Sequence, residues 1–282
     1  MPAPCLDTKQ DLLVKSSLGV IHGLSVETAD GRGARAFLGI PFGTNVSAER
    51  RFELAGSVDN FTSPFFAVEQ GPACLQPLMY KIGQHLPKNI SDDCLTVNVY
   101  TPSGCSLQGE ALPVLFFTTG WMSYELNWNG MFDWQHLASR GRLVVVAPNY
   151  RLGVVGFLNR GANRSNTSNL GVRDVLLAWQ WTRKHIAAFG GDPGNVVPVG
   201  HGSASIMMTG LLCRPQLLDV RRAVLLSQSL FTPIGNNSGP TGLARTREAA
   251  LHAECCTASD CRNISAPGKL FLTQLWVFLR AL

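Results

Sequence analysis

Apolar residues along this chain gather in short runs whose spacing predicts β-strands. Residues 95–100 alternate between apolar and polar side chains, whereas residues 114–117 and 143–147 are uninterrupted apolar runs. Alternation is typical of a strand with one covered face, and uninterrupted runs are typical of strands covered on both faces. The loose alternation of residues 12–26 predicts an N-terminal β-hairpin region. The turn-rich residues 31–64 indicate an irregular surface segment.

The period of the apolar positions changes to that of a helix in residues 170–189, where apolar side chains recur three or four residues apart. The sequence Gly190-Gly191-Asp192-Pro193 that follows contains both usual helix breakers. We expect a buried strand at 196–199, a helix at about 205–212 and a further strand at 222–227. This alternation of strands and helices predicts an α/β fold with parallel pairing and right-handed crossover connections.

Composition places the chain among ordinary globular proteins. Hydrophobic residues make up 45% and charged residues 15% of a chain of 282 residues, which can bury a sizeable core. The net charge of +5 is scattered over single or paired Lys and Arg, so we expect no nucleic-acid partner. The most apolar stretch, residues 270–282, is interrupted by polar residues and is shorter than the ~18 residues of a membrane span. We therefore expect a buried helix there and no transmembrane segment.

Cysteines and glycosylation motifs indicate the secretory pathway. The eight Cys residues include no C-x-x-C pair, so we expect no metal and no cofactor. Seven Asn-x-Ser/Thr sequons occur, where about two are expected by chance, which favours a secreted or ER-lumenal chain that forms disulfides. Residues 1–10 lack the apolar stretch of an export signal, which has either been removed or was never present because the transcript is incomplete. The sequon residues are Asn45, Asn60, Asn89, Asn163, Asn166, Asn236 and Asn263.

Several motifs, in order and at the right spacing, identify a family. They include Phe37-Leu38-Gly39-Ile40-Pro41-Phe42, Ser91-Asp92-Asp93-Cys94-Leu95, Asn149-Tyr150-Arg151-Leu152-Gly153 and Phe189-Gly190-Gly191-Asp192-Pro193-Gly194-Asn195-Val196. On these motifs the chain resembles the type-B carboxylesterases and cholinesterases from about residue 14 to residue 229. The resemblance implies a partial α/β-hydrolase fold, with a mostly parallel sheet and flanking helices. It implies that residues 1–256 are the N-terminal half of such a domain, followed by an apolar tail, 257–282, without a family motif.

The resemblance fails where the family carries its catalytic serine. Counting from Asp192 places the nucleophile of the family's Gly-Glu-Ser-Ala-Gly motif at Gly202, which has no side chain. Ser203 follows one residue later, on the first turn of the expected helix, and Ala204 replaces the glycine that lets strand and helix approach closely. Pro198 lies inside the preceding strand, where it removes a backbone N–H, so we expect a distorted turn.

The other catalytic elements of the family are also missing. The glycine-rich oxyanion loop is replaced by Thr119-Gly120-Trp121-Met122, whose large side chains would crowd the pocket. The acid and histidine of the triad follow the nucleophile on later strands in this fold. His252 lies too few elements downstream to act as the base, so we expect a structural role for it. His201 occupies the place of the family's Glu, and its role is expected to be local.

Structural features of the family are retained. The resemblance implies a disulfide between Cys74 and Cys94, which would close a loop worth roughly 3 kcal/mol. It implies a second disulfide in which Cys261 pairs with Cys255 or Cys256, although their tight spacing departs from the family. It also implies two ion pairs, Arg51 with Asp92 and Arg151 with Asp174.

Three functions remain open at this point. The first is a catalytically incompetent, glycosylated binding or assembly module with a protein partner, similar to the neuroligin and thyroglobulin branch of the family. Within this branch, the segment 48–52 favours similarity to thyroglobulin. The second is a serine ester hydrolase that uses Ser203 with an acid such as Asp219, Glu248 or Asp260. The third is a truncated paralogue whose last strand is an uncovered sheet edge.

Overall fold

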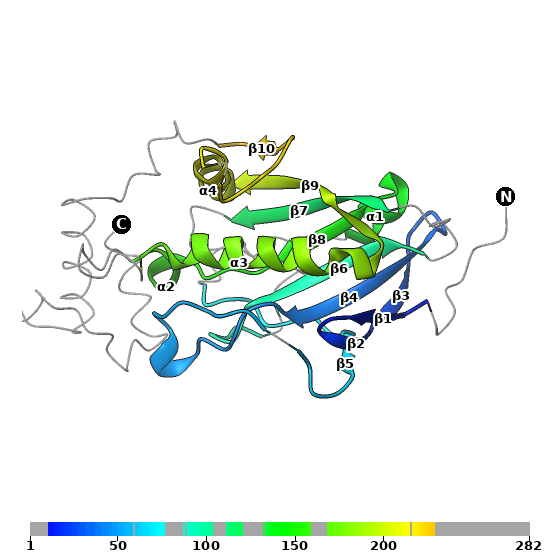
Figure 1. Cartoon of the computed structure of the whole chain (residues 1–282), viewed down its shortest axis with the longest axis horizontal. Helices are drawn as coiled ribbons and strands as arrows, with labels where there is room; N and C mark the ends of the chain where they lie inside the picture. Colours follow the sequence, from blue (N-terminus) through cyan, green and yellow to red (C-terminus); the bar gives the residue numbers. More distant parts are fainter. Residues whose placement is uncertain are drawn as a thin grey trace, which may run out of the picture.

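A seven-stranded mixed sheet organises the fold (Figure 1). The structure is a computed structural model that describes residues 11–58, 60–76, 87, 89–103, 111–120, 132, 134–158, 168–214 and 216–228. In spatial order the strands are β10 (Val224–Leu226), β9 (Gly191–Gly202), β7 (Leu112–Gly120), β8 (Val144–Pro148), β6 (Thr96–Pro102), β4 (Gly33–Pro41) and β3 (Leu24–Glu27).

Helical connections decide which strands are parallel. Strands β8, β7, β9 and β10 are parallel neighbours, whereas β8, β6, β4 and β3 pair antiparallel. Three helices, α1 (Trp134–Gly141), α3 (Leu170–His185) and α4 (Ser203–Leu212), lie in sequence between successive parallel strands. Such a crossover returns the chain to the same end of the sheet, as parallel pairing requires. The expected parallel sheet is therefore found in the later half of the described chain.

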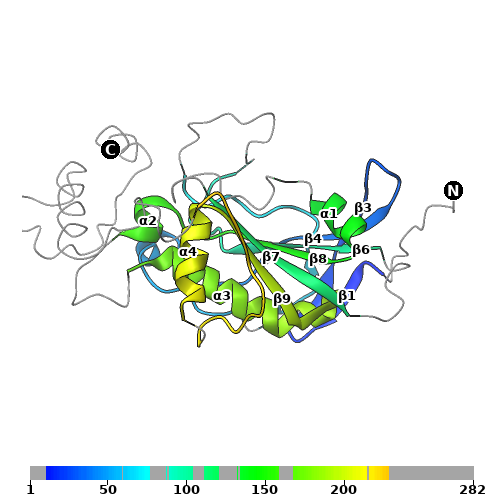
Figure 2. The same ribbon diagram turned by 90° about the horizontal axis from the view of Figure 1, so that it is seen from above.

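Helices cover both faces of the sheet, as Figure 2 shows. Along β8, Val144 and Val146 face the larger core, which includes Trp179 of α3. Val145 faces the opposite side and packs in a second core with Trp134 of α1. Every residue of β8 is buried, which explains why this strand is a continuous apolar run in the sequence.

The expected helices and strands are present, but several begin or end at other residues than predicted. The predicted helix 170–189 consists of α3 followed by one 3-10 segment, η4 (Ile186–Phe189), which ends at Gly190 with a φ of 86°. The predicted strand at 196–199 is the centre of the longer β9, and the predicted helix at 205–212 begins two residues earlier, at Ser203. The short N-terminal strands are β1 (Leu13–Ser16) and β2 (Gly19–His22), which form a small sheet with β5 (Phe65–Phe66).

The prediction of an irregular surface segment at 31–64 was wrong for its first third. Residues 33–41 form β4, in which Phe37 and Ile40 are fully buried. The register against β6 shifts between these two residues, at a bulge where Gly39 has a φ of 65°. Bulges of this kind need a glycine, so the residues that signal turns in the sequence here belong to a buried strand. The rest of the segment is largely loop, with η1 at Ala48–Arg50.

The sheet ends at β10, which pairs with β9 and with no other strand in the described part of the chain. Its side chains Val224, Leu225 and Leu226 are about two-fifths exposed. The expected uncovered edge strand is thus confirmed within these residues. None of the described helices has the length and apolarity that a membrane crossing requires.

Candidate functional site at the turn between β9 and α4

The central feature of the candidate site is Gly202, the last residue of β9, which directly precedes Ser203, the first residue of α4. Its φ of 63° and ψ of −135° lie in a region that residues with a Cβ rarely adopt. Gly200 brings the helix close to the strand, because a Cβ there would lie 2.7 Å from the Ser205 Cα. The chain therefore makes a sharp strand-to-helix turn with a backbone-only residue at its apex.

The end of β7 closes over this apex. Strands β7 and β9 are in register from Val196 onward, so that Gly120 lies opposite Gly202. A Cβ built on Gly202 would lie well inside van der Waals contact with the Gly120 carbonyl oxygen. A backbone acceptor thus occupies the space into which a side chain at position 202 would project.

Ser203 points toward the same carbonyl. Its hydroxyl donates a 3.0 Å hydrogen bond to the Gly120 oxygen, and the residue is 5% exposed. Of the acids considered as its partner, Asp219 is an exposed residue beyond the end of α4. Glu248, Asp260 and His252 lie outside the described residues, as do Trp121 and Met122 of the expected oxyanion loop. The Ser203 hydroxyl is therefore buried against the backbone of β7. A catalytic nucleophile would instead have to face an open cleft.

Other polar groups around the turn also bond to one another. The Tyr150 hydroxyl donates to the Thr119 carbonyl at 2.9 Å, and burial raises the pKa of this phenol far above its usual range. Thr119 Oγ1 and His201 Nδ1, on adjacent strands, share a 3.0 Å hydrogen bond. The local role expected for His201 agrees with this contact. Ser205 donates to the Gly200 carbonyl at 2.6 Å and accepts a 3.1 Å bond from the N–H of Leu226.

The prediction that Pro198 distorts this turn was wrong. Pro198 lies opposite Phe116 of β7, and the pairing of these strands continues without a break to Gly202. Strand β10 begins only opposite Val199. Pro198 therefore adjoins a described strand on one side alone, and the missing N–H is tolerated there. Ala204, expected to hinder close packing, is fully buried in the first turn of α4.

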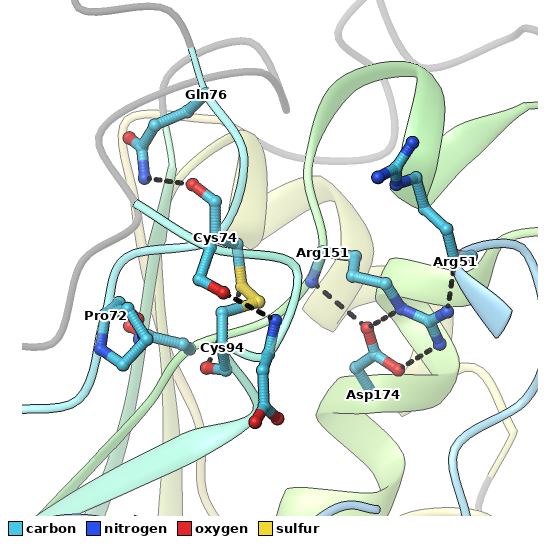
Figure 3. Close-up of a disulfide and its surroundings, with 10 residues drawn as sticks. Arg51, Pro72, Cys74, Gln76, Cys94, Arg151 and Asp174 are labelled. Carbon is cyan, nitrogen blue, oxygen red and sulfur yellow. Dashed lines mark hydrogen bonds and ion pairs between the residues drawn. A yellow bond between two sulfur atoms is a disulfide. The ribbon is translucent and has the colours of Figure 1, made fainter. Parts of the chain in front are cut away.

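The loops beside α2 (Gly153–Phe157) are held by two ion pairs and a disulfide. Figure 3 shows the disulfide and one of the pairs, Arg151 with Asp174. Arg151 contacts Asp174 through Nε at 2.7 Å and Nη2 at 2.6 Å, and both side chains are buried. Nη1 of Arg151 also donates to the Arg51 carbonyl at 3.1 Å. Arg51 in turn donates to Asp92 through Nε at 2.9 Å. Both expected ion pairs are confirmed, and they form one connected network.

The structure contains the disulfide that the resemblance implies, Cys74–Cys94, whose cysteines are separated by 20 positions in the sequence. Cys213 is an exposed free thiol, and Cys5, Cys105, Cys255, Cys256 and Cys261 lie outside the described residues. A small cavity between the disulfide and the ion pairs is lined in part by Leu75, Leu152 and Val155. It has room for about one water molecule, so it is too small for a substrate.

Three of the seven sequons lie in the described part of the chain. Asn45, Asn60 and Asn89 are all exposed, whereas Asn163, Asn166, Asn236 and Asn263 lie outside it. No group of three or more His, Cys, Asp or Glu among the described residues could hold a metal ion.

The sheet order, the crossovers and the sharp turn define an α/β-hydrolase fold. Juvenile hormone esterase from Manduca sexta superposes with a TM-score of 0.86 at 23% identity, over 96% of this chain and 51% of that one. A model of the carboxylesterase family matches residues 10–270. The chain therefore belongs to the carboxylesterase family.

Proteins of this family that are similar to the chain include a neuroligin, a thyroglobulin and a cholinesterase. Neuroligin-1 of Caenorhabditis elegans is 31% identical over 80% of this chain and 32% of its own length. Thyroglobulin of Rattus norvegicus is 36% identical over 70% of this chain and 7% of its own length. Cholinesterase of Mus musculus is 30% identical over 94% of this chain and 45% of its own length. The chain thus spans less than half of each of these relatives.

Sequence reasoning did not anticipate the part played by Gly120 and Tyr150. The sequence placed Gly120 in the segment that replaces the family's oxyanion loop, and it placed Tyr150 within a family motif without assigning it a role. Their contacts with Ser203 and Thr119 depend on the register between distant strands. The only signal in the sequence was the position of Gly120 shortly after the apolar run 114–117.

Proposed function

We propose that this chain is a catalytically inactive member of the carboxylesterase family, serving as a glycosylated, disulfide-bonded binding or assembly module of the secretory pathway. The observation that carries the proposal is the closed apex at Gly202, which the Gly120 carbonyl faces. The similarity to neuroligin-1 and thyroglobulin supports a role in binding another protein.

The inactivity follows from two independent deficits. Position 202 offers no nucleophile, and losing a nucleophile costs about 10⁶ in rate. The atom nearest the apex is a carbonyl oxygen, whose partial charge has the wrong sign to stabilise a developing oxyanion. An oxyanion-hole donor contributes about 10²–10³ in rate, so restoring one group leaves the other deficit in place.

Two measurements test this proposal. The wild-type chain should not be labelled by a fluorophosphonate probe, and labelling that Ser203→Ala abolishes would instead establish Ser203 as a nucleophile. The Gly202→Ser variant should hydrolyse an activated acetyl ester no faster than Gly202→Ala, which introduces the same Cβ without the hydroxyl. Clear turnover by Gly202→Ser alone would contradict the proposal.

The secretory location has its own support and its own test. Exposed Asn45, Asn60 and Asn89, together with the Cys74–Cys94 disulfide, are what a chain folded in an oxidising lumen would carry. The full chain, expressed with an added export signal, should lose mass on treatment with peptide N-glycosidase. A chain that is secreted without any glycan would refute this part.

A further inference from the structure

An apolar ridge lies on the small N-terminal sheet, at the strand β5. Phe66 is 66% exposed, more than any other large apolar side chain in the described residues. Its ring stacks on His22 of β2 at 4.9 Å, and Val68, two residues further on, is also exposed. Strand β5 is the outer strand of the order β1-β2-β5 (Figure 1). We call His22, Phe66 and Val68 the β5 ridge.

Exposed apolar side chains on an edge strand are a liability that proteins usually cover. Ala67, between Phe66 and Val68, is fully buried and donates its N–H to the His22 carbonyl at 2.7 Å. With Ala67 held inward, the side chains of Phe66 and Val68 on either side of it lie on the solvent side. The ridge cannot turn inward, so its cover has to come from outside the sheet.

A sequon lies at the other end of the same strand pair. The N–H of Phe61 donates to the Leu18 carbonyl at 2.7 Å, directly before β2. The ring of Phe61 stacks on Phe65 at 4.8 Å, and both pack against the main core. Asn60, directly before Phe61, is exposed.

Asn60 is thus exposed close to the β5 ridge, because the stack of Phe61 on Phe65 brings the sequon next to the strand that carries Phe66. Ile21 and Phe65, opposite each other in the register, point to the core, whereas His22 and Phe66 point to solvent. From Gly19, which follows Leu18 beside the sequon, to His22 the strand advances three residues, or about 10 Å. This distance is comparable to the length of the first few sugars of an N-linked chain.

We propose that an N-linked glycan on Asn60 lies along the β5 ridge and covers Phe66 and Val68. The inference rests on the glycosylation in the proposed function. In the modification, the Asn60 amide nitrogen bonds to the anomeric carbon of a lipid-pyrophosphate-linked oligosaccharide, the lipid pyrophosphate leaves, and the amide loses one proton. The C–H groups on one side of a pyranose ring then pack on the electron-rich face of Phe66, while the hydroxyls on the other side face water.

The test is a double-mutant cycle on the full chain produced through a secretory pathway. The four forms are wild type, Asn60→Gln, Phe66→Thr and the double variant, with Thr62→Ala as a second way to remove the glycan. Phe66→Thr keeps a good strand former at the edge. The matched control is Asn89→Gln, an exposed sequon in the disulfide-closed loop. The readouts are glycan occupancy by peptide mass, the melting temperature and the fluorescence of a dye that binds apolar surface.

Loss of the Asn60 glycan should lower the melting temperature by about 2–4 °C and raise dye binding. In the Phe66→Thr background the same loss should change neither, and Asn89→Gln should leave dye binding unaltered. An occupied Asn60 whose removal has equal effects with and without Phe66 overturns the inference, as does an unoccupied Asn60 in a chain glycosylated elsewhere. Both of these results leave the proposed function intact, whereas a chain without any glycan contradicts it as well.

Discussion

The substitution Asp174→Asn should destabilise the protein strongly, because it removes one partner of a buried ion pair and leaves the other, Arg151, charged. The Asp174 carboxylate accepts three hydrogen bonds from Arg151: from Nε, from Nη2 and, at 3.1 Å, from the backbone N–H. The two side chains are 1% and 3% exposed, so water cannot replace a lost acceptor. An amide offers one oxygen and places N–H donors against a guanidinium, which leaves a buried charge uncompensated. Breaking such a pair costs about 3–5 kcal/mol.

Equilibrium unfolding in urea, followed by tryptophan fluorescence, measures this cost. A loss of 3–5 kcal/mol corresponds to a fall in melting temperature of about 6–20 °C. The matched control is Glu53→Gln, which breaks the exposed pair with Arg50 and should cost about 0–1 kcal/mol. Replacing both buried partners, as Arg151→Met with Asp174→Leu, should recover part of the loss. If Asp174→Asn is no more costly than Glu53→Gln, the reasoning from burial fails.

Two further predictions concern the disulfide and a buried imidazole. Replacing Cys74 and Cys94 together by Ser should lower the free energy of unfolding by about 3 kcal/mol, and a reducing agent should lower the urea midpoint of the variant by less than that of the wild type. Burial, helped by the charge of Lys184, lowers the pKa of His185 from 6.5 to about 4, so its neutral form stabilises the fold above pH 6.5. That contribution should fall by about 1–2 kcal/mol as the pH drops from 6.5 to 5, and a His185→Gln variant should show a flatter dependence of the urea midpoint on pH across this window.

The sequence predicted the later, parallel half of the sheet well because that half follows simple packing rules. Strands buried on both faces must be continuous apolar runs, and residues 143–147 satisfy this requirement in β8. The helix α3 was predictable because its apolar stripe has a period of 3.6 residues. The family motifs added the disulfide and both ion pairs, which no periodicity could have indicated.

Prediction from the sequence failed at glycine and proline residues, which occur in loops but also at particular positions within strands. Glycine and proline in residues 33–41 suggested a loop, yet Gly39 makes the bulge that lets Phe37 and Ile40 both face inward. Pro198 suggested a distorted strand, but whether a proline harms a sheet depends on which neighbouring strand lies beside it. Both errors have the same origin, because partners distant in the sequence decide the outcome.

The closed turn illustrates the same dependence on register, with a consequence for function. Gly120 meets Gly202 because β7 and β9 are paired along their length, so the carbonyl cannot withdraw unless the end of β7 moves. Ser203 and Tyr150 donate hydrogen bonds to consecutive carbonyls there, Gly120 and Thr119, and so oppose such a movement. If the chain is inactive as proposed, its inactivity is therefore a property of the sheet as well as of one missing hydroxyl. The ion pairs and the disulfide lie in other loops, so a scaffold with this turn closed can keep its stability.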